Sequence, residues 1–134
     1  MSTTNEYMLI FRGTDWHVHL SPEETQQVAG RMMDWFTDLK AAGKATGGRP
    51  LESTGKLVTG KNGRVVADGP FAESKEAIAG YFMLQVADID EAVAIAKDCP
   101  TLAYGVQVEV RPLMDVCPYA KHVPADQQLA EAIA

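Results

Sequence analysis

Hydrophobic residues alternate along the segment Glu6–Arg12, near the start of the chain. Three apolar side chains would face one side of a strand and two the other. They are Tyr7, Leu9 and Phe11 against Met8 and Ile10. Because both sides are apolar, the pattern predicts a central strand that is buried on both faces.

The period becomes helical after Ser21. Ser21 and Glu24 have the spacing of a capping box, and Pro22 suits the first helical position. Apolar residues then recur at helical spacing until Gly43, a residue that favours the end of a helix. They are Val28, Met32, Trp35, Phe36 and Leu39. We interpret this stripe as core or dimer contact.

Further strands and a second helix follow. The segment Ala45–Thr54 is rich in Gly and Pro and has room for a short strand. Lys56–Thr59 and Arg64–Ala67 flank an Asn-Gly pair, which predicts a β-hairpin. Gly80–Ala87 and Gly105–Arg111 alternate as strands do. Between these two, Asp88 and Glu91 form a second capping pair, and Pro100 stops the helix. The predicted buried face of that helix is Ile89, Ala92, Val93 and Ala96.

The order strand, helix, strand with hairpin, strand, helix, strand predicts an α+β fold of the ferredoxin-like, split β-α-β type. Its helices cover one face of the sheet, so the other apolar face needs a cover. We therefore expect a homodimer with the two sheets face to face. We expect one domain over residues 1–134, with a core at about 6–112 and a C-terminal extension at 113–134. Residues 125–134 would form a short alanine-rich helix.

Composition narrows the classes of partner. The chain has 134 residues and a net charge of −6, which disfavours nucleic acid. No apolar run approaches the ~20 residues of a membrane helix, and the first residues do not read as a signal peptide. We expect a cytoplasmic protein in which Cys99 and Cys117 are free thiols. Neither a zinc site nor a cofactor is predicted.

Asp68 is the main candidate for chemistry, at the start of the run Asp-Gly-Pro-Phe. Pro70 lacks the N–H that an Asx-turn would use, so Asp68 would bond the backbone further on or remain available. One interpretation is a structural turn in which Phe71 packs and Glu73 and Lys75 face water. The other is that Asp68 borders a pocket and acts as a general acid or base.

Two histidines follow the first strand. In an extended segment His17 and His19 would project to the same side and, with Asp15, form a candidate metal pair. Alternatively one of them reaches Asp68, or both are surface loop residues. Arg12 and Arg49 are candidates to hold an anionic ligand and equally plausible as surface charges.

The run Asp68–Glu76, followed by Gly80-Tyr81, resembles the signature of DGPF-domain proteins in the YCII-related family. The similarity extends from Tyr7 to Pro112. The resemblance implies a ferredoxin-like dimer of the dimeric α+β barrel type. YCII-type relatives have been proposed as enzymes with a His–Asp pair whose histidine lies on the first helix. Residues 21–42 contain no histidine, so that pair does not transfer to this chain.

Two functional hypotheses follow. The first is a small-molecule-binding homodimer with acid–base activity in its cleft. Its candidate catalytic residues are Asp68 and His17, and its candidate ligand-binding residues are Arg12, His19, Phe71, Glu73 and Lys75. The second, implied by the resemblance, is a non-catalytic dimeric module with a regulatory or stress role linked to extracytoplasmic-function sigma factors.

Overall fold

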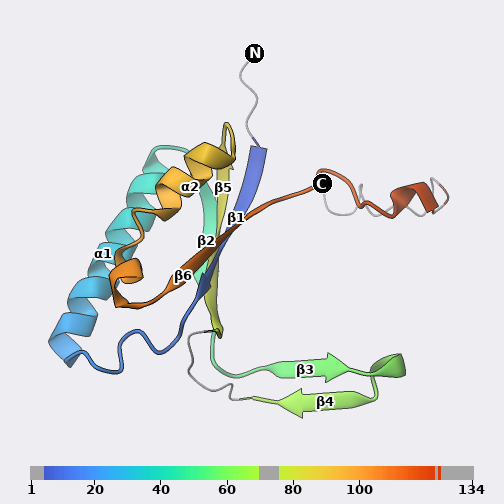
Figure 1. Cartoon of the computed structure of the whole chain (residues 1–134), viewed down its shortest axis with the longest axis horizontal. Helices are drawn as coiled ribbons and strands as arrows, with labels where there is room; N and C mark the ends of the chain where they lie inside the picture. The colour runs from blue at the N-terminus through green and yellow to red at the C-terminus, as the bar shows by residue number, and fades with distance from the viewer. Residues whose placement is uncertain (1–4, 70–75, 123, 125–134) are drawn as a thin grey trace.

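The chain folds into a four-stranded antiparallel sheet with two helices on one face, as the computed structural model in Figure 1 shows. The structure describes residues 5–69, 76–122 and 124. The strands are β1 (Asn5–Arg12), β2 (Ala45–Pro50), β3 (Lys56–Thr59), β4 (Val65–Asp68), β5 (Ile78–Val86) and β6 (Gln107–Pro112). The helices are α1 (Pro22–Ala41) and α2 (Ile89–Ala96), with short 3₁₀ segments η1 (Lys61–Gly63), η2 (Pro100–Tyr104) and η3 (Ala120–His122).

The strand order is β2-β5-β1-β6, which is the order of a ferredoxin-like sheet, so the predicted fold class is confirmed. As predicted, β1 lies in the middle, paired with β5 on one side and β6 on the other. Tyr7, Leu9 and Phe11 are buried beneath the helices. Met8 and Ile10 face the opposite side of the sheet, hereafter the outer face, and are only partly buried.

Both ends of α1 follow from local chemistry. The Ser21 hydroxyl accepts a hydrogen bond from the Glu24 N–H at 3.1 Å, and the Glu24 carboxylate accepts one from the Ser21 N–H at 3.1 Å. This is the predicted capping box. After Ala42 the chain turns at Gly43, whose φ of +75° places it in the left-handed region. The Lys44 N–H then donates to the Leu39 carbonyl and closes the last turn.

The second helix differs from its predicted packing at three positions: Ile89 is exposed, Val93 is only partly buried, and Ile95 is buried although it was not predicted to be. Asp88 caps it, since its carboxylate accepts a hydrogen bond from the Glu91 N–H at 2.9 Å. The buried residues are Ala92, Ile95 and Ala96, whereas Ile89 is 43% exposed. Side chains on a helix tilt toward its N-terminus, so the first residue of α2 reaches past the packed part of the helix. The prediction that Ile89 is buried was therefore wrong.

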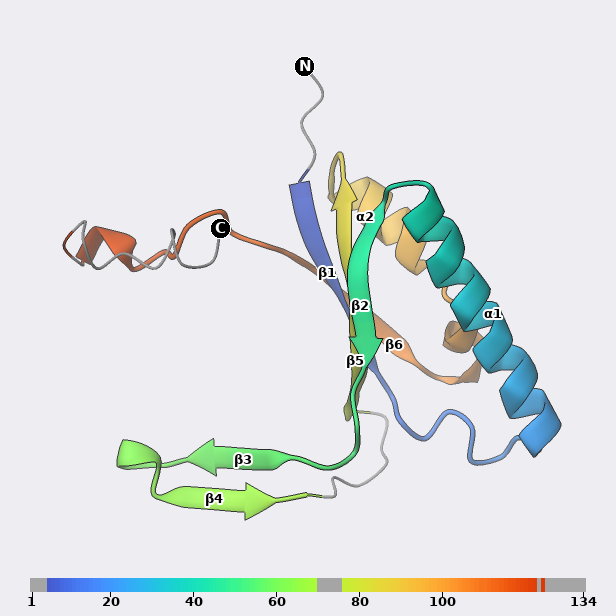
Figure 2. The same cartoon turned by 180° about the vertical axis from the view of Figure 1, so that it is seen from behind.

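The β3–β4 pair forms a second sheet that stands apart from the first. As predicted, the turn contains an Asn-Gly pair, and both Asn62 and Gly63 have positive φ. Figures 1 and 2 show the hairpin extending from one end of the main sheet, on the side away from the helices. Residues 113–122, which follow β6, extend on that same side.

No helix in the described part of the chain is long and apolar enough to cross a membrane. Cys99 is buried, Cys117 is partly buried, and both thiols are free. The predicted helix over residues 125–134 lies outside the described residues.

Candidate functional site

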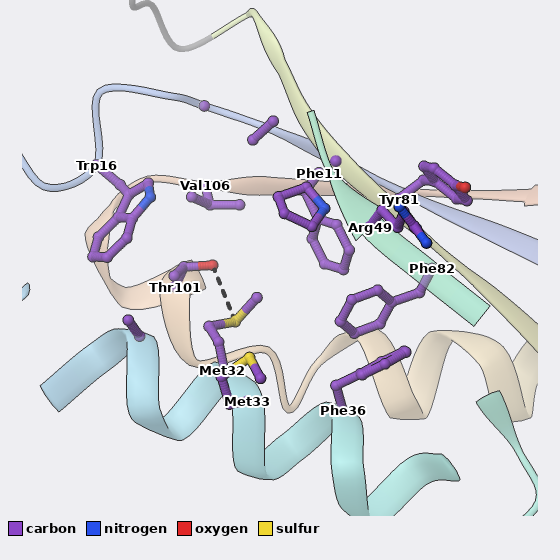
Figure 3. Close-up of a pocket in the computed structure, with 16 residues that line it drawn as sticks. Phe11, Trp16, Met32, Met33, Phe36, Arg49, Tyr81, Phe82, Thr101 and Val106 are labelled. Atoms are coloured by element: carbon purple, nitrogen blue, oxygen red, sulfur yellow. Dashed lines mark hydrogen bonds between the residues drawn. The ribbon is translucent and has the colours of Figure 1, made fainter. Parts of the chain in front are cut away.

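A cavity of about 430 Å³ lies between α1 and the sheet (Figure 3). Its floor comes from β1, β5 and β2, one wall from α1, and the far end from the loop after β1 and from η2. The lining residues are Phe11, Gly13, Trp16, Ala29, Met32, Met33, Phe36, Gly48, Arg49, Pro50, Ala79, Gly80, Tyr81, Phe82, Thr101 and Val106. The helical stripe read from the sequence therefore does more than fill the core, because Met32 and Phe36 also line this cavity.

Aromatic rings fix the shape of the floor. The Phe82 ring lies 4.7 Å from that of Phe11, edge to face, and 4.4 Å from that of Phe36. The Trp35 ring contacts both Phe82 and Phe11 from α1. Phe11, Trp35 and Phe82 each contact at least two other rings, and Phe36 contacts Phe82, so these contacts position the rings before any ligand arrives.

Two glycines allow β2 and β5 to approach at the edge of the cavity. A Cβ on Gly48 would lie 2.6 Å from the Tyr81 carbonyl oxygen and 2.7 Å from the Phe82 ring. A Cβ on Gly80 would lie 2.7 Å from the Arg49 carbonyl oxygen. Real Cβ atoms do not come this close to backbone, so both positions need glycine. The Gly/Pro-rich segment that the sequence left as a short strand is thus part of the cavity wall.

Thr101 is the polar side chain buried most deeply among the described residues, with 3% exposed. Its hydroxyl lies 3.2 Å from the Cys99 sulfur and 3.9 Å from the Met32 sulfur. Both partners are sulfur atoms, which are weak hydrogen-bonding groups. The hydroxyl therefore sits in the cavity wall with capacity for a stronger partner.

Charge is kept away from the interior of the cavity. Arg49 pairs with Tyr81 across β2 and β5, next to Gly48 and Phe82, so alternation places both side chains on the outer face. Figure 3 shows Phe82 directed toward α1, and Arg49 and Tyr81 on the other side of the strands. Their contribution to the lining comes from the edge of the sheet. Among the described lining residues, Arg49 is the one that carries a charge.

The loop between β1 and α1 separates the two predicted histidines. Residues 16–19 form turns, with the Val18 N–H bonded to the Asp15 carbonyl and the Leu20 N–H to that of His17. The metal-pair hypothesis required an extended segment, and these local hydrogen bonds instead turn the chain, as the alternative of loop residues allows. The His17 ring packs edge to face at 5.4 Å on Trp16, which lines the cavity, but His17 itself is not a lining residue, and His19 is exposed. No group of three or more metal-ligating side chains gathers within the described residues.

Arg12 lies on the outer face of the sheet, not in the cavity. Its guanidinium donates to the Glu109 carboxylate at 3.0 Å and to the Glu76 carbonyl at 3.3 Å. Arg111 also donates to Glu109, at 2.9 Å. Hydrogen bonds from Arg111 and then Arg12 lower the pKa of Glu109 below its ordinary value. Arg12 is thus part of a charged network beside the apolar centre of the outer face.

Asp68 is exposed at the end of β4, where it pairs with Lys56 at 3.2 Å. Both side chains are about 70% exposed. The hairpin that carries Asp68 projects from the side of the sheet opposite to the helices, and so away from the cavity (Figures 1 and 2). Within one chain neither His17 nor Asp68 lines the cavity, although His17 contacts the lining residue Trp16. Phe71, Glu73 and Lys75 lie outside the described residues.

Sequence reasoning did not identify Trp16, Phe82 and Thr101 as site residues. Trp16 follows a strand and has no periodic neighbours, and Phe82 reads as an ordinary strand residue. Thr101 comes directly after a helix stop. The available signal was the number of large apolar residues on α1 opposite a glycine-rich strand, which leaves space that side chains do not fill.

Comparisons with known proteins agree with this fold. A 50-residue segment is 42% identical to uncharacterized protein R00369 of Rhizobium meliloti (strain 1021), and covers 37% of this chain and 40% of that protein. The chain thus matches less than half the length of this relative. A solved structure with TM-score 0.52 and 14% identity covers 81% of this chain and 93% of its own. It is 5-chloro-2-hydroxyhydroquinone dehydrochlorinase from Burkholderia phenoliruptrix AC1100, in complex with 2,5-dihydroxybenzoquinone.

At that identity the dehydrochlorinase supports the fold and leaves the chemistry of this chain open. The family model of the YCII-related domain matches residues 6–117, which include every strand and helix that forms the cavity. The chain therefore belongs to the YCII-related domain family.

Proposed function

We propose that this protein binds a small, uncharged ring compound in the cavity between α1 and the sheet. The observation that carries the proposal is a cavity of about 430 Å³ walled by aromatic and methionine side chains, with one buried hydroxyl. Small-molecule sites have volumes of roughly 300–1,000 Å³ and combine apolar walls with a few polar groups.

The lining determines the class of ligand. Phe11, Phe36 and Phe82 offer ring edges and faces to a planar molecule, and Met32 and Met33 adapt to its outline. A buried anion or cation would need an opposite charge, and Arg49 is directed away from the interior. A solved structure of similar fold is a complex with 2,5-dihydroxybenzoquinone, which supports a ligand of ring size.

We include acid–base chemistry in the proposal, with His17 as the group that exchanges a proton with a ligand hydroxyl. His17 contacts the lining residue Trp16, and histidine is the side chain that most often acts as a general acid or base. Asp68 could take part in this chemistry only at the cavity of a second copy of the chain, because on its own chain it projects away from the cavity. His17→Asn is expected to abolish a pH-dependent change in the absorbance of a bound phenol, and His19→Asn to leave it intact.

We also propose that the protein is a homodimer. The outer face has an apolar centre made by Met8, Ile10, Tyr81 and Met83, all of them partly exposed. A contiguous apolar area of this kind on a sheet marks an interaction surface.

Calorimetric titration with 2-naphthol, a neutral ring compound, tests the cavity. We expect binding with a negative heat-capacity change, and little binding of the anionic 2-naphthalenesulfonate. Ala29→Phe places a ring in the lining and should weaken 2-naphthol binding about tenfold or more, which corresponds to ~1.4 kcal/mol. Thr37→Phe, an exposed position on α1 outside the lining, is the matched control.

If Ala29→Phe bound 2-naphthol as tightly as wild type does, the ligand would bind outside the cavity. Failure of both probes would favour the other hypothesis, a non-catalytic module with a regulatory role linked to extracytoplasmic-function sigma factors.

A further inference from the structure

The β3–β4 hairpin exposes an unusual amount of apolar surface. Leu57, Val58, Val65 and Val66 are each 53–59% exposed. Leu57 pairs with Ala67, and Val58 pairs with Val66. Adjacent residues of a strand point to opposite faces, so both faces of this ribbon are apolar.

A ribbon of this kind does not stand alone in water. Two-stranded hairpins are at best marginally stable without packing against a further strand or helix. This hairpin forms a sheet of its own, and Figures 1 and 2 show it extending away from the body. The Lys56–Asp68 ion pair lies at its base and is largely exposed, so it adds little stability.

We propose that the hairpin is an arm that packs on a second copy of the chain. The inference rests on the proposed homodimer and extends it. The hairpin projects on the same side as the outer face, and so do residues 113–122 (Figures 1 and 2). That second segment also exposes apolar side chains, with Met114 at 70% and Tyr119 at 71%. A sheet that docks on the outer face therefore lies between two apolar segments.

Charge favours a second copy as the occupant. Residues 56–68 carry three cations, Lys56, Lys61 and Arg64, and one anion, Asp68. The hairpin is therefore +2 in a chain of net charge −6, which leaves −8 on the remainder. Lys61 and Arg64 lie at the exposed tip. A basic arm and an acidic body are complementary between two copies of the same chain.

Area points the same way. Four strands spaced about 4.8 Å apart, over six residues of about 3.3 Å each, give an outer face of roughly 400 Å² before side-chain relief. A stable interface buries ~800 Å² per partner. The outer face alone is therefore small for a stable dimer interface. An arm from each copy would add apolar surface to that interface.

Sedimentation velocity across a dilution series of the full chain tests this inference. Leu57→Glu and Val66→Glu place a charge on opposite faces of the arm. At least one should raise the dimer dissociation constant about tenfold or more. Ile89→Glu, a partly exposed apolar position on α2 on the helix side, is the matched control and should dimerise as wild type does. Circular dichroism verifies that each variant is folded.

The tip is tested separately. Lys61→Glu combined with Arg64→Glu should weaken the dimer and reduce its sensitivity to salt. Arg31→Glu, an exposed cation on α1, is the control. Dimers of unchanged affinity in all arm variants would overturn the arm and leave a sheet-to-sheet dimer. A monomeric wild type would overturn both the arm and the homodimer. Binding of 2-naphthol by the cavity is a separate measurement, and neither of these two results would change it.

Discussion

The hydroxyl of Thr101 and its methyl group make separable contributions at the scale of single residues. The hydroxyl is buried against the sulfurs of Cys99 and Met32, and the methyl group fills space beside the core. A hydrogen bond to a weak partner contributes little net stability. The loss of a buried methyl group costs about 1 kcal/mol.

Two substitutions separate these contributions. We expect Thr101→Val to change the free energy of unfolding by less than about 1 kcal/mol. The substitution keeps the shape of the side chain and removes only a hydroxyl whose hydrogen-bond partners are sulfur atoms. Thr101→Ser keeps the hydroxyl, loses the methyl group and should be the more destabilising of the two. Urea denaturation measures both. A larger loss in Thr101→Val would mean that the hydroxyl has a structural partner of its own.

Two glycines on different elements should respond to the same substitution with opposite signs. At Gly80 on β5 a new Cβ would meet the Arg49 carbonyl oxygen at 2.7 Å, so Gly80→Ala pushes β2 and β5 apart. We expect Gly80→Ala to lower the free energy of unfolding by about 1–3 kcal/mol, as at other overpacked sites. At Gly30 on α1 a Cβ has nothing within 4 Å. Gly30→Ala should stabilise the protein by about 0.5–1 kcal/mol.

Thermal unfolding of both variants against wild type measures this pair. Equal effects of the same sign would show that the strand contact at Gly80 relaxes without cost. Ligand binding gives a second readout, since Gly80 borders the cavity and Gly30 does not.

Elements defined by local chemistry were predictable from the sequence, and contacts between elements were not. The capping box at Ser21, the Asn-Gly turn and the alternation in β1 depend on neighbours within a few residues. The cavity depends on how far Phe82 lies from Met32 and Thr101, which are distant in sequence. The sequence left the conformation at His17 open between an extended segment and a loop, because the hydrogen bonds of the turn come from backbone groups, which no side-chain pattern reports.

The whole molecule has two apolar regions with different purposes. The helix side of the sheet holds the core and the cavity, and the outer face with its two projecting segments is the surface that we propose for a second copy. Two charged clusters lie at the periphery of the molecule. Glu109 joins Arg12 on β1 to Arg111 on β6, and Glu91 on α2 bonds the Ala87 N–H and Lys44.

These two clusters make folding sensitive to acid. The pKa of Glu91 is lowered from its ordinary value of 4.5 by the hydrogen bond from the Ala87 backbone and by Lys44, and the pKa of Glu109 is lowered by Arg111 and Arg12. Below pH 4.5 the unfolded chain binds these protons before the native state does. The stability from both clusters is therefore complete above pH 4.5 and is lost as the pH falls through the native pKa values.

The double variant Glu91→Gln, Glu109→Gln removes both titrations and keeps the hydrogen-bonding shape. We expect it to be less stable than wild type at pH 7 and to lose less stability between pH 7 and pH 3. Urea midpoints at fixed ionic strength across this range measure the slope. Glu52→Gln, which alters an exposed carboxylate outside both clusters, should follow the wild-type curve. A double variant with the wild-type slope would place the acid sensitivity in other carboxylates.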